Sequence, residues 1–177
     1  MVRLPPAWVV FFCLLLFGFG ELAGALLGGY PQPIKKAIGG AARERLQVHG
    51  LTGVGDIDRT VLENVETEAL ARVHTFHLHA HGLALVVFVL GLIVTNMALS
   101  PKAERMLLGL ICLGLLYPFG WLTMVFALPF YGRSEAFRLV ERFFFIPFGG
   151  AFLFIVWGLI LLYLFRWIGG KGKIRRE

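Results

Sequence analysis

Four of the five histidines in this chain lie within eight residues, in the string VHTFHLHAHG. On a helix each residue advances by about 100°, so His74, His77 and His81 share one face and His79 points away. His77 and His81 are four residues apart, the spacing at which two imidazoles of one helix can hold a single metal ion. The residue types and spacing therefore predict a metal site at His74, His77 and His81.

One helix supplies only one side of a metal ion, so the remaining ligands must come from other helices. Glu21 and Met124 both fall in apolar segments, at a depth similar to that of the histidines. An acid inside an apolar span costs about 2.5–3.5 kcal/mol on insertion and usually faces the bundle interior or a partner. We expect Glu21 or Met124 to complete the ligand set. Glu21 could equally act as a proton acceptor, or be protonated or bonded to a histidine without a further role.

Other polar residues on the same long helix are expected to support the site rather than bind the ion. Glu63 and Glu66 continue the histidine face towards the N-terminus, where carboxylates can collect cations or orient imidazoles. His79 is expected beside a smaller polar stripe that contains Glu68 and Arg72.

The pattern favours a copper or zinc ion over haem b. Two histidines on one side of one helix cannot bind opposite faces of a haem iron. A haem would need Met124, His49, a histidine from a second copy of the chain or an open position, whereas copper or zinc needs fewer assumptions. A proton- or pH-sensing role for the histidines, or interfacial histidines without chemistry, remain alternatives.

The elements that must position these residues are membrane-spanning helices. Hydrophobic residues make up 58% of the 177 residues, and the mean hydropathy is +0.76. A spanning helix needs about 20 apolar residues, and a backbone in lipid must satisfy its own hydrogen bonds. The sequence therefore predicts an all-α membrane protein, a single domain over residues 1–177 that forms a four-transmembrane-helix bundle. The expected spans are about 7–28, 76–99, 106–128 and 143–168.

The connection between the first two spans, from about Gly29 to Thr75, is predicted to be a long extracytoplasmic loop that is Gly-rich before Asp58. Thr60 and Glu63 have the spacing of a capping box, and Gly and Pro are absent from there to Gly82. We therefore expect one continuous helix from about Thr60 to Met97, whose first turns project outwards. Tyr117-Pro118 predicts a kink in the third span.

The distribution of bases predicts the orientation. The segments on one side of the four spans carry many basic residues and few acidic ones. This predicts that both termini lie on the cytoplasmic side of a bacterial inner membrane. These bases are Arg3, Lys102, Arg105, Arg166, Lys171, Lys173, Arg175 and Arg176. The alternative for the first span is a signal peptide cleaved near Ala25.

A short stretch of the second span carries a resemblance. His79-Ala-His81-Gly82, followed by an apolar helix with Gly91, is similar to the HxHG helix entry of small uncharacterised four-helix bacterial membrane proteins. It is distantly similar to histidine-bearing helices of haem–copper oxidase subunit I relatives. The chain is far shorter than such an oxidase, so the resemblance implies a haem- or copper-linked setting and no more.

These observations predict a metal- or haem-binding membrane subunit in electron transfer or metal handling. The alternatives are an assembly subunit of a larger complex without its own cofactor, and a proton-coupled transporter. The expected partners are the lipid bilayer and other membrane subunits or further copies of the chain. The net charge of +6 accompanies hydrophobic spans, so anionic lipid explains it and nucleic acid is not expected. No nucleophile–base pair is evident, which argues against an enzyme in its own right.

Overall fold

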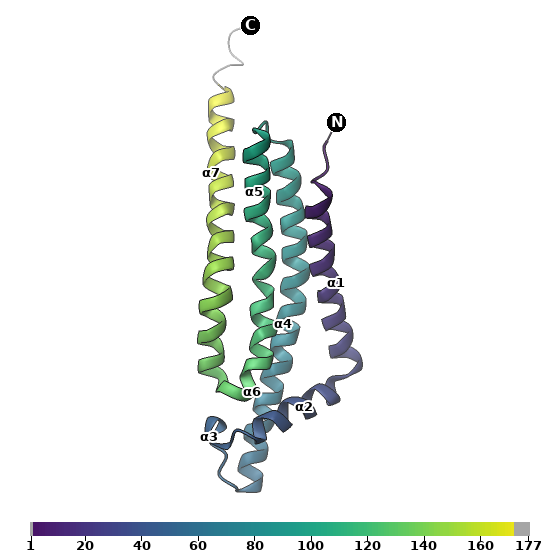
Figure 1. Cartoon of the computed structure of the whole chain (residues 1–177), viewed down its shortest axis with the longest axis vertical. Coiled ribbons are helices and arrows are strands. Elements are labelled where there is room, and N and C mark those ends of the chain that lie inside the picture. Colours follow the sequence, from purple (N-terminus) through teal and green to yellow (C-terminus); the bar gives the residue numbers. More distant parts are fainter. Residues whose placement is uncertain (1, 172–177) are drawn as a thin grey trace.

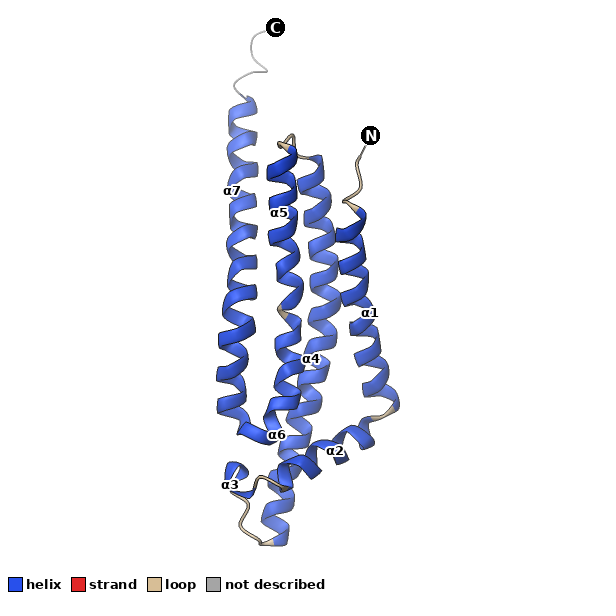
Figure 2. Ribbon diagram, viewed as in Figure 1, coloured by secondary structure: helices blue, strands red, loops and turns tan. Residues whose placement is uncertain are grey.

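The computed structural model describes residues 2–171, and within that range the chain forms helices and no strand (Figure 2). In chain order the elements are α1 (Ala7–Gly29), α2 (Pro31–Arg43), α3 (Leu46–His49), α4 (Gly55–Asn96), α5 (Pro101–Leu113), the 3₁₀ turn η1 (Gly114–Leu116), α6 (Pro118–Val140), the π-helical segment η2 (Glu141–Gly150) and α7 (Ala151–Lys171).

Among the described residues, three helical runs are long and apolar enough to cross a membrane: Ala7–Gly29, Gly55–Asn96 and Pro101–Phe165. This supports an all-helical membrane protein. The third run reverses direction at Gly132, whose φ of 70° and ψ of 172° lie in a region that only glycine adopts readily. After the reversal, η2 and α7 return beside α6 and α5 (Figure 1). At Tyr117-Pro118, where the sequence predicts a kink, the 3₁₀ turn η1 separates α5 from α6.

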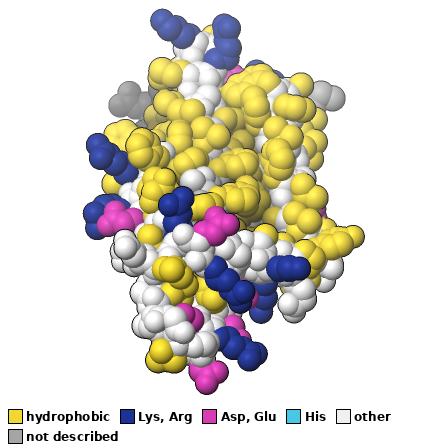
Figure 3. Space-filling view, turned by 60° about the horizontal axis from the view of Figure 1, so that its bottom comes forward, with side chains coloured by type: hydrophobic (Ala, Val, Ile, Leu, Met, Phe, Trp, Pro, Cys, Tyr) yellow, Lys and Arg dark blue, Asp and Glu magenta, His cyan; other side chains and the backbone are white. Residues whose placement is uncertain are grey.

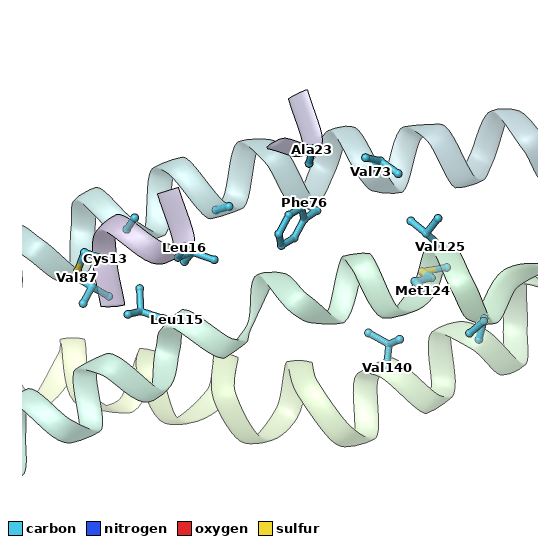
Figure 4. Packing of buried hydrophobic residues seen from close by; sticks show 14 of the residues in the cluster. Cys13, Leu16, Ala23, Val73, Phe76, Val87, Leu115, Met124, Val125 and Val140 are labelled. Carbon is cyan, nitrogen blue, oxygen red and sulfur yellow. The ribbon is translucent and has the colours of Figure 1, made fainter. Parts of the chain in front are cut away.

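Helix α4 is the centre of the bundle, because α1, α2, α5 and α6 all pack against it. Its buried residues recur every three or four positions and many are small, which lets neighbouring helices approach closely. In the apolar core, Val87 of this stripe lies near Cys13 and Leu16 of α1, and Phe76 lies beside Ala23 of α1 (Figure 4).

The prediction of a long Gly-rich loop after the first span is wrong over most of its length, because α2 and α3 occupy it. Pro31 begins α2 at a position where a missing amide costs nothing. Ile38 and Ala42 then recur on one face and are buried, and α2 packs against α4 and α6. Figure 3 shows charged side chains gathered around this end of the molecule, whereas the flank of the bundle is largely hydrophobic.

The expectation of one continuous helix is confirmed, but α4 starts at Gly55 and the capping box is wrong. Thr60 Oγ1 donates to the carbonyl oxygen of Asp56 at 3.1 Å, and Glu63 forms an ion pair with Arg59 at 3.0 Å. Asp58 supports the start of the helix instead. Its carboxylate accepts hydrogen bonds from the amide of Thr52 at 2.7 Å and from that of Gly53 at 2.8 Å.

We expect Asp58→Ala to loosen the turn before α4 without unfolding the bundle. The hydrogen bond from the Thr52 backbone, with those from Gly53 and the Thr52 hydroxyl, lowers the pKa of the Asp58 carboxyl. A lowered pKa stabilises the turn above the unfolded value of about 3.9, and this contribution is lost as the pH falls through the folded value. Amide exchange at Thr52 and Gly53 should therefore accelerate in Asp58→Ala at pH 7. In the wild type, amide exchange at Thr52 and Gly53 should accelerate only below about pH 4. Unchanged exchange in the variant would contradict this role.

Part of the predicted orientation falls on residues that the structure does not describe. Lys173, Arg175 and Arg176 lie outside the described residues. At the opposite terminus, the N-terminal segment is fixed to the end of α4. Asn96 accepts a hydrogen bond from the backbone amide of Arg3 at 2.9 Å and donates one to its carbonyl oxygen at 2.8 Å.

Candidate functional site

Two of the clustered histidines face α1 and lie against glycines on that helix. Nδ1 of His77 donates to the carbonyl oxygen of Gly20 at 2.8 Å. A Cβ atom at Gly24 would come within 2.7 Å of Cε1 of His77, and a Cβ at Gly20 within 2.9 Å of Cε1 of His81. Gly20 and Gly24 thus form a GxxxG pair that opens room for both imidazoles between the helices.

Both ring nitrogens of His81 have partners, one on α4 and one on α1. Nδ1 bonds to the carbonyl oxygen of His77 at 2.7 Å, one turn earlier in α4. Nε2 lies 3.0 Å from Oε1 of Glu21 on α1. Phe17 covers the ring edge-on, with a centroid distance of 4.4 Å. The side chain of His81 is therefore only 21% exposed, whereas that of Glu21 is 64% exposed.

The hydrogen bonds define the protonation pattern of the site. A carbonyl oxygen only accepts, so Nδ1 of His77 and Nδ1 of His81 must each carry a proton. In the neutral imidazole, Nε2 is then the atom with a free lone pair. An ionised carboxylate also only accepts, so the contact between His81 and Glu21 holds one proton, on either Nε2 or the carboxyl group. Both imidazoles are thus oriented by the backbone, with Nε2 as the reactive nitrogen.

The remaining predicted ligands are placed less closely. His74 is exposed, and its ring stacks on that of His77 with a centroid distance of 6.3 Å. Met124 is 1% exposed and lies in the apolar core near Val125 and Val140 (Figure 4). The structure therefore pairs His81 with Glu21 and places the ring of His77 edge-on against that of His81, with His74 stacked on His77. Within residues 2–171, no group of three or more His, Cys, Asp or Glu side chains is close enough to form a ready metal cluster.

Glu63 and Glu66 were expected to support the histidines, but their contacts are with other residues. Glu63 pairs with Arg59, and both side chains are exposed. The carboxylate of Glu66 lies directly against Gly39 of α2, so that a side chain at position 39 would collide with it. His49, considered as a distant haem ligand, instead bonds through Nε2 to the carbonyl oxygen of Pro129 at 2.8 Å and connects α3 to α6.

His79 faces the opposite side of α4, as its position on the helix predicts. Its ring stacks on Trp121 at a centroid distance of 6.0 Å and meets Tyr117 edge-on at 5.5 Å. Arg72 lies over the same indole, with its guanidinium carbon 5.4 Å from the ring centroid. The stripe of His79, Arg72 and Glu68 was visible in the sequence, but its partners on α6 were not.

Comparison with protein-family models, with curated proteins and with solved structures finds no match to this chain. Two oriented imidazoles and a largely exposed carboxylate lie where α1 and α4 meet, about two turns from the end of α1.

Proposed function

We propose that this chain is an integral membrane subunit that binds a copper or zinc ion between α1 and α4. The ligands in this proposal are Nε2 of His77, Nε2 of His81 and a carboxylate oxygen of Glu21. The observation that carries it is the pair of Nδ1 hydrogen bonds to backbone carbonyls, at 2.8 and 2.7 Å. Metal-binding histidines commonly donate their second nitrogen in this way, which fixes the tautomer and the direction of the ligand nitrogen.

The distances support an ion of this size. Nε2 of His81 and Oε1 of Glu21 are 3.0 Å apart. Two ligands at about 2.0–2.1 Å from a tetrahedral zinc ion lie about 3.3 Å from each other. A small movement of the exposed Glu21 side chain would admit the ion in place of the shared proton. One carboxylate and two neutral imidazoles would offset half of a divalent charge.

A bare ion suits this interface better than haem b. The rings of His77 and His81 lie so close to Gly24 and Gly20 that an added methyl group would collide with them. A macrocycle is far larger than a methyl group, so it could enter only after α1 and α4 separated. An ion held at the exposed Glu21 edge would not need the helices to separate.

The exposure of Glu21 favours metal handling over permanent storage. A carboxylate that is 64% exposed leaves one side of the ion open to exchange or to a ligand from a partner. His74, stacked beside His77, offers an imidazole on the route towards α2. We propose four membrane crossings, with the reversal at Gly132 separating the last two, both termini in the cytoplasm and the metal site in the outer half of the membrane.

Metal titration of the purified full chain tests this function. We expect one copper or zinc ion per chain by elemental analysis after equilibrium dialysis. Glu21→Gln should weaken binding about tenfold or more, since the amide is a poorer ligand than the carboxylate. Glu63→Gln, at an exposed acid of α4 paired with Arg59, is the matched control and should leave binding unchanged.

Three outcomes would contradict the proposed copper or zinc site. A Soret band would identify a haem protein. A chain that stays metal-free in excess metal and copurifies only with larger membrane proteins would favour an assembly subunit. Equal affinity of wild type and Glu21→Gln would remove the carboxylate from the ligand set.

A further inference from the structure

A second polar cluster, independent of the metal proposal, lies on the opposite face of α4. Glu68 accepts from Nη2 of Arg72 at 2.7 Å and from Nε of Arg133 at 3.2 Å, both through Oε1. Arg72 in turn covers the indole of Trp121, and His79 stacks on the same indole. The cluster thus joins the start of the α4 span to α6 on both sides of the Gly132 reversal.

This cluster has an excess of positive charge and of hydrogen-bond donors. One carboxylate faces two guanidinium groups, so one positive charge remains among Glu68, Arg72 and Arg133. Within the described residues, Nε of Arg72 and Nε1 of Trp121 are buried donors without a hydrogen-bond partner. Unpaired buried donors are costly, and a ligand rich in acceptor oxygens is complementary to both features.

An apolar groove of about 380 Å³ begins beside this cluster and runs along the membrane-spanning part of α4. His79 and Tyr117 stand at the end nearest the charged groups, and they are the polar side chains of its lining. The rest of the lining comes from α4, η2 and α7, and includes Leu78, Gly82, Val86, Gly149, Phe152 and Leu153.

We infer that this face binds a phospholipid with an anionic headgroup. The phosphate would lie against Arg72 and Arg133, and an acyl chain would follow the groove past Val86. Arg72 and His79 are seven residues apart, which is about 10 Å along a helix and returns to the same face. His79 and Tyr117 therefore lie where the ester carbonyls of such a lipid would accept their hydrogen bonds.

The positive charge and the apolar groove together favour an anionic phospholipid over other ligands. A free phosphate would match the arginines but leave the groove unused, and a neutral lipid would fill the groove but leave the positive charge unmatched. Basic sites between transmembrane helices recognise acidic lipid headgroups through the same combination.

Native mass spectrometry of the purified full chain tests the inference. The chain is incubated with equal amounts of phosphatidylglycerol and phosphatidylcholine that carry identical acyl chains. We expect the wild type to retain phosphatidylglycerol with at least a fivefold preference. Arg133→Gln should abolish the preference, because it removes the unbalanced charge. Val86→Phe should lower the retention of both lipids, because a larger side chain narrows the groove.

Matched variants separate this site from general lipid contact. Arg138→Gln removes an exposed arginine that pairs with Glu135, outside the cluster. Val89→Phe enlarges a side chain that is 45% exposed, close to the 43% of Val86, on the same helix. Both controls should behave as the wild type. The inference is overturned if the wild type shows no preference, if the controls change retention equally, or if millimolar inorganic phosphate displaces the bound lipid.

Discussion

Replacement of both His77 and His81 by alanine is expected to abolish stoichiometric metal binding. These residues supply two of the three proposed ligands, and their Nε2 atoms are the oriented lone pairs of the site. Loss of an outer partner of a metal ligand alone costs about 10–100-fold in affinity, so loss of two ligands should exceed a hundredfold. Equilibrium dialysis against copper or zinc, followed by elemental analysis, measures the change directly.

The neighbouring histidines provide the controls for this experiment. His79→Ala removes an imidazole from the same helix, but one that faces Trp121 on the other side. It should leave the affinity within about twofold of the wild type, which is below a 0.5 kcal/mol change. His74→Ala tests whether the third imidazole joins the ion, and an intermediate loss would show that it does. Helical content and elution volume should match the wild type in every variant. Undiminished binding in the double variant would contradict the assignment of both ligands.

The sequence was sufficient for those features of the fold that follow from local pattern. Hydropathy located the runs around α1 and α4, and the helical angle between His77 and His81 gave their common face. Glu21 was a candidate because an acid in an apolar span needs a partner, and the structure supplies one in His81. Each of these inferences needed only spacing along one helix and the cost of burying a charge.

The incorrect and missing features depend on which face of one helix meets another. Met124 matched the histidines in depth, but depth says nothing about rotation about the helix axis, and it turns into the apolar core. Helix α2 was hidden because Gly39 and Gly40 resemble loop residues. Gly39 is in fact needed where Glu66 packs against it. The capping box failed because Asp58, whose carboxylate accepts amides before the helix, fixes an earlier start.

The GxxxG pair on α1 is the signal that could have revealed the interface from sequence. Gly20 and Gly24 are one turn apart, and Ala80 and Ala84 have the same spacing on α4. A Cβ atom at Gly20 would come within 3.0 Å of the Cβ of Ala80. Small residues at this spacing on two helices permit close approach of the backbones in a membrane. His77 and His81 could then be placed against α1 rather than against α6.

Gly24→Ala is expected to destabilise the bundle, and Gly18→Ala is its control. The new Cβ would lie 2.7 Å from Cε1 and 2.8 Å from Nδ1 of His77. That ring is held by its bond to the Gly20 carbonyl oxygen, so it must either break this bond or push α1 away. Overpacking of this kind costs about 1–3 kcal/mol, and the lost hydrogen bond adds about 1 kcal/mol. Thermal unfolding in detergent, followed by tryptophan fluorescence, measures the loss.

Gly18→Ala adds the same methyl group to the same helix at a position with no atom within 4 Å of the new Cβ. Alanine is a better helix former than glycine by about 1 kcal/mol, so this variant should be as stable as the wild type or slightly more so. The opposite signs of the two changes separate a steric effect at His77 from any general effect of alanine in α1. Gly24→Ala should also weaken metal binding, because His77 can no longer hold Nε2 in its present direction. If both variants unfold at the same temperature as the wild type, α1 and α4 are not in the close contact on which the proposed metal site depends.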